Sequence, residues 1–214
     1  EWKFCGIERK RALFAKLKEA LYAMADDLSA AKVQPPGGAG IPPLVERVID
    51  YYVSKLDDGA GQLIEHGDQG TNYVYKEPLG VVAIFVPFNG PMLGALLSAI
   101  PALVAGNTIV VKAPDQEAPQ ALKVMQAFKE AGFPAGVVNA ISGKGPEVGQ
   151  ALVAHPATRL ISFTGSTATG KKIMATAAAD LKRVQLNLGS KTAQIIFPDA
   201  NIEAAVQAIV GSAF

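Results

Sequence analysis

The sequence predicts an α/β fold, a doubly wound and mostly parallel sheet with helices on both faces. From residue 80 onward, apolar segments of strand length alternate with segments of helical periodicity. The expected strands are nearly unbroken apolar runs, which is typical of parallel strands that are covered on both faces. The chain has 214 residues, of which 50% are hydrophobic, so it is long enough to bury one large core.

The first part of the chain is expected to pack against this sheet. Residues 7–31 place apolar side chains at helical spacing, residues 35–40 form a Pro/Gly-rich break, and residues 41–55 resume a helical pattern. Residues 62–76 contain short extended segments around a Gly-Asp-Gln-Gly turn, which predicts a β-hairpin or ribbon. We therefore expect a helical segment over 1–61 and, over 62–76, a ribbon that is a candidate oligomerisation element.

The main domain is expected to span residues 77–214, with its strands and helices in alternation. The predicted strands are 80–86, 108–112, 137–142, 160–163 and 183–188. The predicted helices are 92–105, 119–131, 147–154, 166–179 and one that starts at residue 201, and an apolar segment, 193–197, precedes the last helix. Right-handed crossovers should make this sheet doubly wound and Rossmann-like.

Composition excludes several classes of partner. The 20 basic and 19 acidic residues give a net charge of +1, which would not recruit nucleic acid or an anionic membrane. The lone Cys5 allows no intramolecular disulfide and no zinc cluster, and its amphipathic setting favours a packing role over a reactive thiol. No apolar run approaches the roughly 20 residues of a membrane span, and the first residues lack a signal-peptide pattern. We expect a cytoplasmic protein with small-molecule partners and no metal.

Two of the strand-to-helix loops carry side chains that could take part in binding or catalysis. Ligands of open parallel sheets bind at such loops. In Val86-Pro87-Phe88-Asn89-Gly90-Pro91, the amide of Asn89 is a neutral donor that can stabilise an oxyanion, although the same residues also describe a plain turn. Lys112 ends an apolar strand and is either a solvated terminus or a donor to a nucleotide ribose or phosphate.

Two later loops are rich in glycine or hydroxyl groups. The segment 142–149 only partly matches a dinucleotide-binding fingerprint. The segment 163–170 joins a strand to a helix, and it is equally an anion site at a helix start and a Ser/Thr helix cap. Neither His66 nor His155 lies beside both an acid and a nucleophile at an evident strand end, so both are poor catalytic candidates. The Lys171-Lys172 pair is typical of a solvated helical face.

Taken in order, five segments resemble the aldehyde dehydrogenase superfamily from about residue 77 onward. They are Glu77-Pro78-Leu79-Gly80-Val81-Val82, Pro87-Phe88-Asn89, Gly106-Asn107-Thr108 through Lys112, Phe163-Thr164-Gly165-Ser166, and Leu186-Asn187-Leu188-Gly189-Ser190-Lys191. The N-terminal helices and ribbon are compatible with this family but less diagnostic.

The resemblance implies a nicotinamide-nucleotide site. Asn89 matches the side chain that completes the oxyanion hole together with the backbone N–H of the nucleophile. Lys112 matches the ligand of the adenosine ribose, and Gly145 lies in the segment against the adenine. Gly165 and Ser166 match the helix start that meets the pyrophosphate. The full expected coenzyme-binding set is Ile84, Phe85, Val86, Pro87, Phe88 (where the family usually has tryptophan), Lys112, Asp115, Gly145, Phe163, Thr164, Gly165, Ser166, Leu188 and Gly189.

The coenzyme is expected to be NAD, with NADP as the alternative. A carboxylate three residues after the lysine, here Asp115, would repel a 2′-phosphate. The loop is one residue longer than the family norm, so Glu117 is a second candidate for this place.

Two departures from the family pattern bear on activity. Asn187 stands where the family has the glutamate that activates water, and Ser190 replaces the second glycine of that motif. An amide cannot accept a proton near neutral pH, so release of the acyl group to water should be crippled. The CoA-acylating semialdehyde members resemble this sequence in having asparagine there. The family's Gly-Gln-x-Cys nucleophile would lie a few residues beyond Phe214.

Two hypotheses about function follow. In the first, these residues are the coenzyme-binding part of an NAD(P)-dependent aldehyde dehydrogenase, expected to be a homo-oligomer, which oxidises an aldehyde through a cysteine thioester. The 214 residues by themselves would then bind the nucleotide without oxidising the aldehyde. In the second, the chain is a truncated, inactive homologue that serves as a nucleotide-binding or subunit-interaction module.

Overall fold

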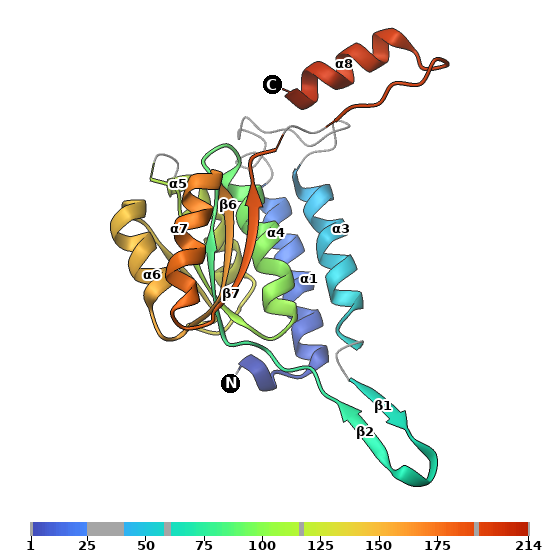
Figure 1. The fold of residues 1–214 in the computed structure, drawn as a ribbon, viewed down its shortest axis with the longest axis vertical. Coiled ribbons are helices and arrows are strands. Elements are labelled where there is room, and N and C mark those ends of the chain that lie inside the picture. Colours follow the sequence, from blue (N-terminus) through green and yellow to red (C-terminus); the bar gives the residue numbers. More distant parts are fainter. Residues whose placement is uncertain (1, 25–40, 58–60, 116–117, 191–192, 214) are drawn as a thin grey trace.

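A five-stranded parallel sheet forms the centre of the molecule (Figure 1). The computed structural model describes residues 2–24, 41–57, 61–115, 118–190 and 193–213. The strands are β3 (Val81–Phe85), β4 (Thr108–Lys112), β5 (Val138–Ile141), β6 (Thr158–Gly165) and β7 (Arg183–Leu188), in the spatial order β5-β4-β3-β6-β7. The chain therefore enters the sheet at its central strand, β3, and continues outward through β4 and β5. It then returns to add β6 and β7 on the other side of β3. The predicted doubly wound fold is confirmed.

Helices cover both faces of the sheet because alternate strand residues point to opposite sides. On one face, Val82 and Ile84 of β3 belong to a large apolar cluster with α4 (Pro91–Val104) and α5 (Ala118–Glu130). On the other face, Ala83 and Phe85 belong to a smaller cluster with α6 (Gln150–Ala154) and α7 (Thr167–Ala178). The two faces are therefore packed by different pairs of helices.

The N-terminal helices form a further layer outside α4 and α5. Helix α1 (Ile7–Ala23) contacts α5 and α3 (Ile41–Ser54), and α3 contacts α4. The predicted helix over 7–31 is confirmed as far as Ala23, while the rest of it and the break at 35–40 lie outside the described residues. This layer adds a second row of helices to one face of the sheet only.

Aromatic rings hold this layer in place. Phe133 lies at the centre, with its ring centroid 5.2 Å from Phe128, 5.4 Å from Phe14 and 5.6 Å from Trp2. The indole N–H of Trp2 donates to the carbonyl of Leu103, 3.2 Å away. Edge-to-face contacts and a satisfied indole make this a well-specified core.

In the Gly106-Asn107-Thr108 segment, the side chain of Asn107 links two parts of the backbone. Its side chain, only 6% exposed, accepts from the N–H of Gly80 at 3.0 Å and donates to the carbonyl of Ala102 at 3.1 Å. These bonds join the end of α4 to the segment that enters β3. A buried amide with both ends satisfied fixes the position of these two segments.

Two elements extend away from the sheet, at opposite ends of the molecule (Figure 1). The strands β1 (Gln62–Glu65) and β2 (Thr71–Val74) form an antiparallel ribbon whose residues are all exposed, which confirms the predicted ribbon. Helix α8 (Ile202–Ala213) follows a stretch, 193–197, that has no regular secondary structure. A role of this ribbon in oligomerisation stays a prediction. Within the described residues, no helix combines the length and apolar character needed to cross a membrane.

The predicted boundaries differ from the structure mainly at two places. Strand β6 extends two residues beyond the predicted 160–163 at each end, because its neighbours β3 and β7 pair with it along that length. The predicted helix 147–154 begins with a π-helical turn, Gly145–Gly149, before it continues as α6. Pro146 at the start of this turn lacks an N–H and suits a first helical position.

Candidate functional site

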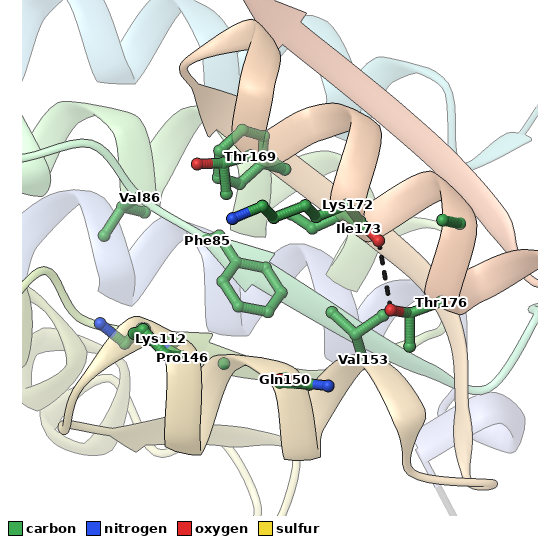
Figure 2. A pocket seen from close by; sticks show the side chains of 14 residues that line it. Phe85, Val86, Lys112, Pro146, Gln150, Val153, Thr169, Lys172, Ile173 and Thr176 are labelled. Carbon is green, nitrogen blue, oxygen red and sulfur yellow. Dashed lines mark hydrogen bonds between the residues drawn. The ribbon is translucent and has the colours of Figure 1, made fainter.

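A cavity of about 600 Å³ lies between α6 and α7 at the carboxyl ends of the central strands (Figure 2). The strand order reverses between β3 and β6, because β4 and β5 lie on one side of β3, and β6 and β7 lie on the other. Open parallel sheets bind ligands at the carboxyl ends of the strands beside such a switch point. The residues that line the cavity are Phe85, Val86, Lys112, Gly145, Pro146, Gly149, Gln150, Val153, Phe163, Thr169, Lys172, Ile173, Ala175 and Thr176.

The floor of the cavity is formed by two phenylalanines from neighbouring strands. Phe85 and Phe163 are register partners on β3 and β6, and their rings meet edge to face with centroids 6.2 Å apart. Val153 of α6 and Ile173 of α7 are buried in the same apolar cluster. The inner part of the cavity is therefore an apolar slot with an aromatic base, which suits a flat ring.

Lys112 brings a charge to the end of β4. It is the register partner of Phe85, and its neighbour Val111 is buried on the opposite face of the sheet, so strand alternation directs Lys112 to the cavity side. The side chain is 8% exposed, and its ammonium group donates to the carboxylate of Asp115. A cation and an anion thus stand together at the edge of an apolar slot.

Asp115 is held ionised by its neighbours. The hydrogen bond from Lys112 lowers the pKa of its carboxyl below the ordinary value, and the backbone of Gly145 and the charge of Lys144 act in the same direction. The carboxylate therefore connects the end of β4 to the segment that enters α6. Glu117, the second candidate for this role, lies outside the described residues.

The start of α7 forms the end of the site nearest β6. Ser166 is the N-cap residue, and its hydroxyl oxygen accepts from the backbone N–H of Thr169 at 3.3 Å. The interpretation of this segment as a Ser/Thr cap is confirmed. The backbone of Gly165 lies against the ring of Phe163. A Cβ at position 165 would come within 2.5 Å of that ring, so this turn requires glycine.

The oxyanion candidate and the general-base position lie outside the cavity, on the same edge of the sheet. Asn89 is exposed in the turn that joins β3 to α4. Asn187 is exposed in β7, where it pairs with Thr164 of β6. Because β6 is the one strand between β3 and β7, these strand ends are about 10 Å apart, twice the usual strand spacing. The fold therefore brings both asparagines to one region from positions 98 residues apart in sequence.

A model described as the aldehyde dehydrogenase family matches residues 1–214, the whole chain. The chain belongs to this family. Its N-terminal helices and ribbon, which were the less diagnostic part of the sequence, fall within the match as well.

A relative and a solved structure match this chain at moderate sequence identity. Hydroxyisobutyraldehyde dehydrogenase of Mycolicibacterium austroafricanum is 37% identical, and the match covers 98% of this chain and 43% of that protein. The chain therefore spans less than half the length of this relative. The structure of PnpE in complex with nicotinamide adenine dinucleotide matches with a TM-score of 0.87 at 37% identity, over 96% of this chain and 44% of PnpE.

A second solved structure gives a similar result. Betaine aldehyde dehydrogenase from Staphylococcus aureus, in complex with NAD⁺, has a TM-score of 0.87 at 30% identity, over 97% of this chain and 43% of that one. Both matches cover nearly all of this chain, so its fold is shared with these two structures.

Several of the residues expected to bind the coenzyme meet in the cavity. Five of them line it, namely Phe85, Val86, Lys112, Gly145 and Phe163. Asp115 stands at the side through its bond to Lys112, and Ser166 caps α7. Thr164 and Gly165 end β6 and pair with Asn187 and Leu188.

The remaining expected residues lie elsewhere. The side chain of Ile84 is buried on the opposite face of the sheet, because it alternates with Phe85, and so it forms no part of the cavity wall. Pro87 and Phe88 lie in the turn beyond β3, and Phe88 is 65% exposed. Leu188 packs close to α7 at Gly170, and Gly189 follows β7.

Nine lining residues are not in the expected coenzyme-binding set, although Pro146, Gly149 and Thr169 among them lie in the candidate loops 142–149 and 163–170. The nine are Pro146, Gly149, Gln150, Val153, Thr169, Lys172, Ile173, Ala175 and Thr176. Most repeat at helical spacing, such as positions 145, 149 and 153, so each helix turns one stripe towards the cavity. The sequence shows these stripes but not that the two helices face each other. In particular, the interpretation of Lys172 as part of a solvated face was incomplete, because this side chain borders the cavity.

Proposed function

We propose that these residues form the coenzyme-binding region of an NAD-dependent aldehyde dehydrogenase that oxidises an aldehyde through a cysteine thioester. The observation that carries this proposal is the cavity between α6 and α7, with the Lys112–Asp115 pair at its edge. Family membership and the NAD complexes of PnpE and betaine aldehyde dehydrogenase support it. A homo-oligomeric assembly is part of the proposal.

The cavity fits the adenosine half of a dinucleotide in size and chemistry. Its volume of about 600 Å³ is within the usual range for small-molecule sites. Gly145 has no atom within 4 Å of where a Cβ would lie, and a Cβ at Gly149 would come within 3.2 Å of the Phe85 ring. The absence of side chains at these two positions leaves room for an adenine against the aromatic floor.

The Lys112–Asp115 pair suits the ribose of the adenosine. An ammonium group and a carboxylate can donate to and accept from adjacent ribose hydroxyls, as acidic residues do in related sheets. Because Asp115 is held ionised, a 2′-phosphate in this place would meet a negative charge. This favours NAD over NADP.

The remaining parts of the site would act on the reacting atoms. Bound NAD supplies the nicotinamide that accepts a hydride from the substrate. We propose that the Asn89 amide donates to the oxygen of the reacting aldehyde and stabilises its developing negative charge. Asn187 cannot take a proton from water at neutral pH, so acyl release in this protein depends on another base or another acceptor.

The 214 residues by themselves are expected to bind the coenzyme without oxidising an aldehyde. Their only cysteine, Cys5, is partly buried and packs against the large apolar cluster that lies on the other face of the sheet from the cavity. Thiohemiacetal formation needs a thiolate beside the nicotinamide. Spectrophotometric assay of these residues with NAD and aldehydes should therefore show no NADH formation.

Calorimetric titration of the 214-residue chain with NAD and with NADP tests the coenzyme proposal. We expect saturable binding of NAD and weaker binding of NADP. In Asp115→Asn, the ratio of the two dissociation constants should shift by about tenfold towards NADP, because the charge repulsion is removed. Asp199→Asn, at an exposed position before α8, is the matched control and should leave the ratio unchanged. Absence of saturable binding by either nucleotide would contradict the proposal.

A further inference from the structure

We propose that Lys172 binds a phosphate group of the nucleotide, at the end of the cavity where α7 begins. This inference rests on the proposed function and adds one residue to it. Lys172 is exposed as a residue, yet it is one of the side chains that border the cavity.

The first line of argument is the charge balance of the cavity. Among its lining residues the charged ones are Lys112 and Lys172, and both are cations. The charge of Lys112 is offset by Asp115, to which it donates a hydrogen bond. Within the part of the chain that the structure describes, no carboxylate forms an ion pair with Lys172. Of the two cations that line the cavity, Lys172 is therefore the one whose charge a bound anion could balance.

The second line of argument is the direction of the side chain. Lys172 lies three residues after Thr169 on α7, and helical side chains lean back towards the N-terminus of their helix. Figure 2 shows the Lys172 chain extending back towards Thr169, with its ammonium end on the side of the cavity where Phe85 and Val86 lie. The charge of Lys172 is thus carried to the first turns of α7.

The third line of argument is the polarity of that helix end. The N-terminus of an α-helix attracts anions through its free N–H groups and its dipole, and α7 is 12 residues long. Ser166 uses its hydroxyl to cap the N–H of Thr169, which leaves the earlier N–H groups of the turn to a ligand. A full positive charge one turn further along adds to this potential in the same direction.

A dinucleotide in the cavity offers its pyrophosphate to this position. With the adenine on the aromatic floor and the ribose at the Lys112–Asp115 pair, the pyrophosphate is the group that leads towards the start of α7. In NADP, the 2′-phosphate is a second source of the same chemistry. Separate nucleotides distinguish these two sources.

The test compares Lys172→Met with Lys171→Met in the 214-residue chain. Lys171 is the adjacent lysine, it is exposed, and it does not line the cavity, so it controls for the loss of one positive charge from α7. Calorimetric titrations with adenosine, ADP, NAD and NADP would be made for each variant. We expect Lys172→Met to bind NAD and ADP about tenfold more weakly, in line with a charge-assisted contact, and adenosine with unchanged affinity.

Each outcome has one meaning for the inference. A loss for ADP and NAD assigns Lys172 to the pyrophosphate, and a loss confined to NADP assigns it to the 2′-phosphate. Equal affinities in Lys172→Met and wild type overturn the inference, as does an equal loss for adenosine, which would indicate packing rather than charge. If the wild-type chain binds neither adenosine nor NAD, the proposed function fails before Lys172 is tested.

Salt dependence gives a second readout. A contact between an exposed ammonium group and a phosphate weakens as ionic strength screens it. The affinity of wild type for NAD should fall more steeply between low and high salt than that of Lys172→Met. Parallel slopes in the two proteins would contradict the contact.

Discussion

The two faces of the sheet are built from similar residues but reach different packing. On the face of α4 and α5, a second layer of helices closes over the core, and three phenylalanines and a tryptophan interlock there. On the face of α6 and α7, the apolar cluster is small, and the rings of Phe85 and Phe163 form the floor of a cavity. One face is filled by the protein, and the other keeps a cavity, which we propose is the nucleotide site.

The difference has a local cause. Helix α6 has only five residues and is preceded by a π-helical turn with glycine at both ends. Glycine at positions 145 and 149 contributes no side chain to the interior, so the slot against α7 stays open. The core on the other face contains large side chains that are fully buried, such as Phe14 and Phe128. Stability and binding are therefore expected to depend on opposite faces.

The largest expected effect is a loss of stability in Phe14→Ala. Phe14 is 0% exposed and meets Phe133 edge to face, so its removal leaves a cavity in a closed core. We expect the free energy of unfolding to fall by about 3–5 kcal/mol. Urea denaturation would measure this, and the affinity for NAD of the folded fraction should stay at the wild-type value.

The matched change on the other face is Ile173→Ala, at a residue that is 7% exposed and lines the cavity. Because this side chain borders space that is already open, we expect a loss below about 2 kcal/mol together with weaker NAD binding. If Phe14→Ala weakened binding and Ile173→Ala did not, the proposed division between the faces would be wrong.

A smaller effect, seen in binding rather than stability, is expected for Lys112→Met. This change removes the cation at the proposed ribose position and leaves Asp115 without this partner. We expect the dissociation constant for NAD to rise about tenfold, because a charge-assisted contact is lost. Calorimetric titration measures it, with Lys123→Met as a control on the helix of the opposite face. An unchanged constant would remove Lys112 from the site.

The smallest expected effect is a dependence on pH. The hydrogen bond from Lys112 lowers the pKa of Asp115, so the stabilising pair is fully present above the ordinary carboxyl pKa and is lost as the pH falls through the lowered value. The difference in unfolding free energy between wild type and Asp115→Asn should stay constant from pH 7 to about pH 5 and shrink only below about pH 4. A difference that shrinks near neutral pH would show that the pair does not hold Asp115 ionised.

Much of the fold could be predicted from the sequence because its signals are local. The strands at 108–112 and 183–188 lie where the sequence predicts them, and the ribbon at 62–76 follows its turn residues. The π-helical turn before α6 was missed, since a single altered turn leaves the helical periodicity nearly unchanged. The extra residues of β6 depend on its neighbours β3 and β7, and its own apolar pattern does not show them.

The candidate site divides in the same way. The family resemblance places Lys112 and Phe163 in the site, because it rests on short motifs that the sequence shows directly. The Ser166 cap follows from the capping preference of serine. The family resemblance implies that Asp115 is the carboxylate that would repel a 2′-phosphate, and the structure adds its bond to Lys112. The sequence predicts a solvated position for Lys172, because a pair of lysines on a helix has no local feature that distinguishes a solvated face from the rim of a cavity.

The sequence by itself therefore determined the order of strands and helices, the family resemblance and the amide at position 187, since each depends on residue identity or on local periodicity. The tertiary structure decided which residues share a space. Strand alternation sends Ile84 into the packed core and Phe85 into the cavity floor, although the two are adjacent in the chain. The facing of α6 and α7 across the sheet then joins Gly145, Lys112 and Lys172 in one site, because contacts between distant segments depend on how the layers pack.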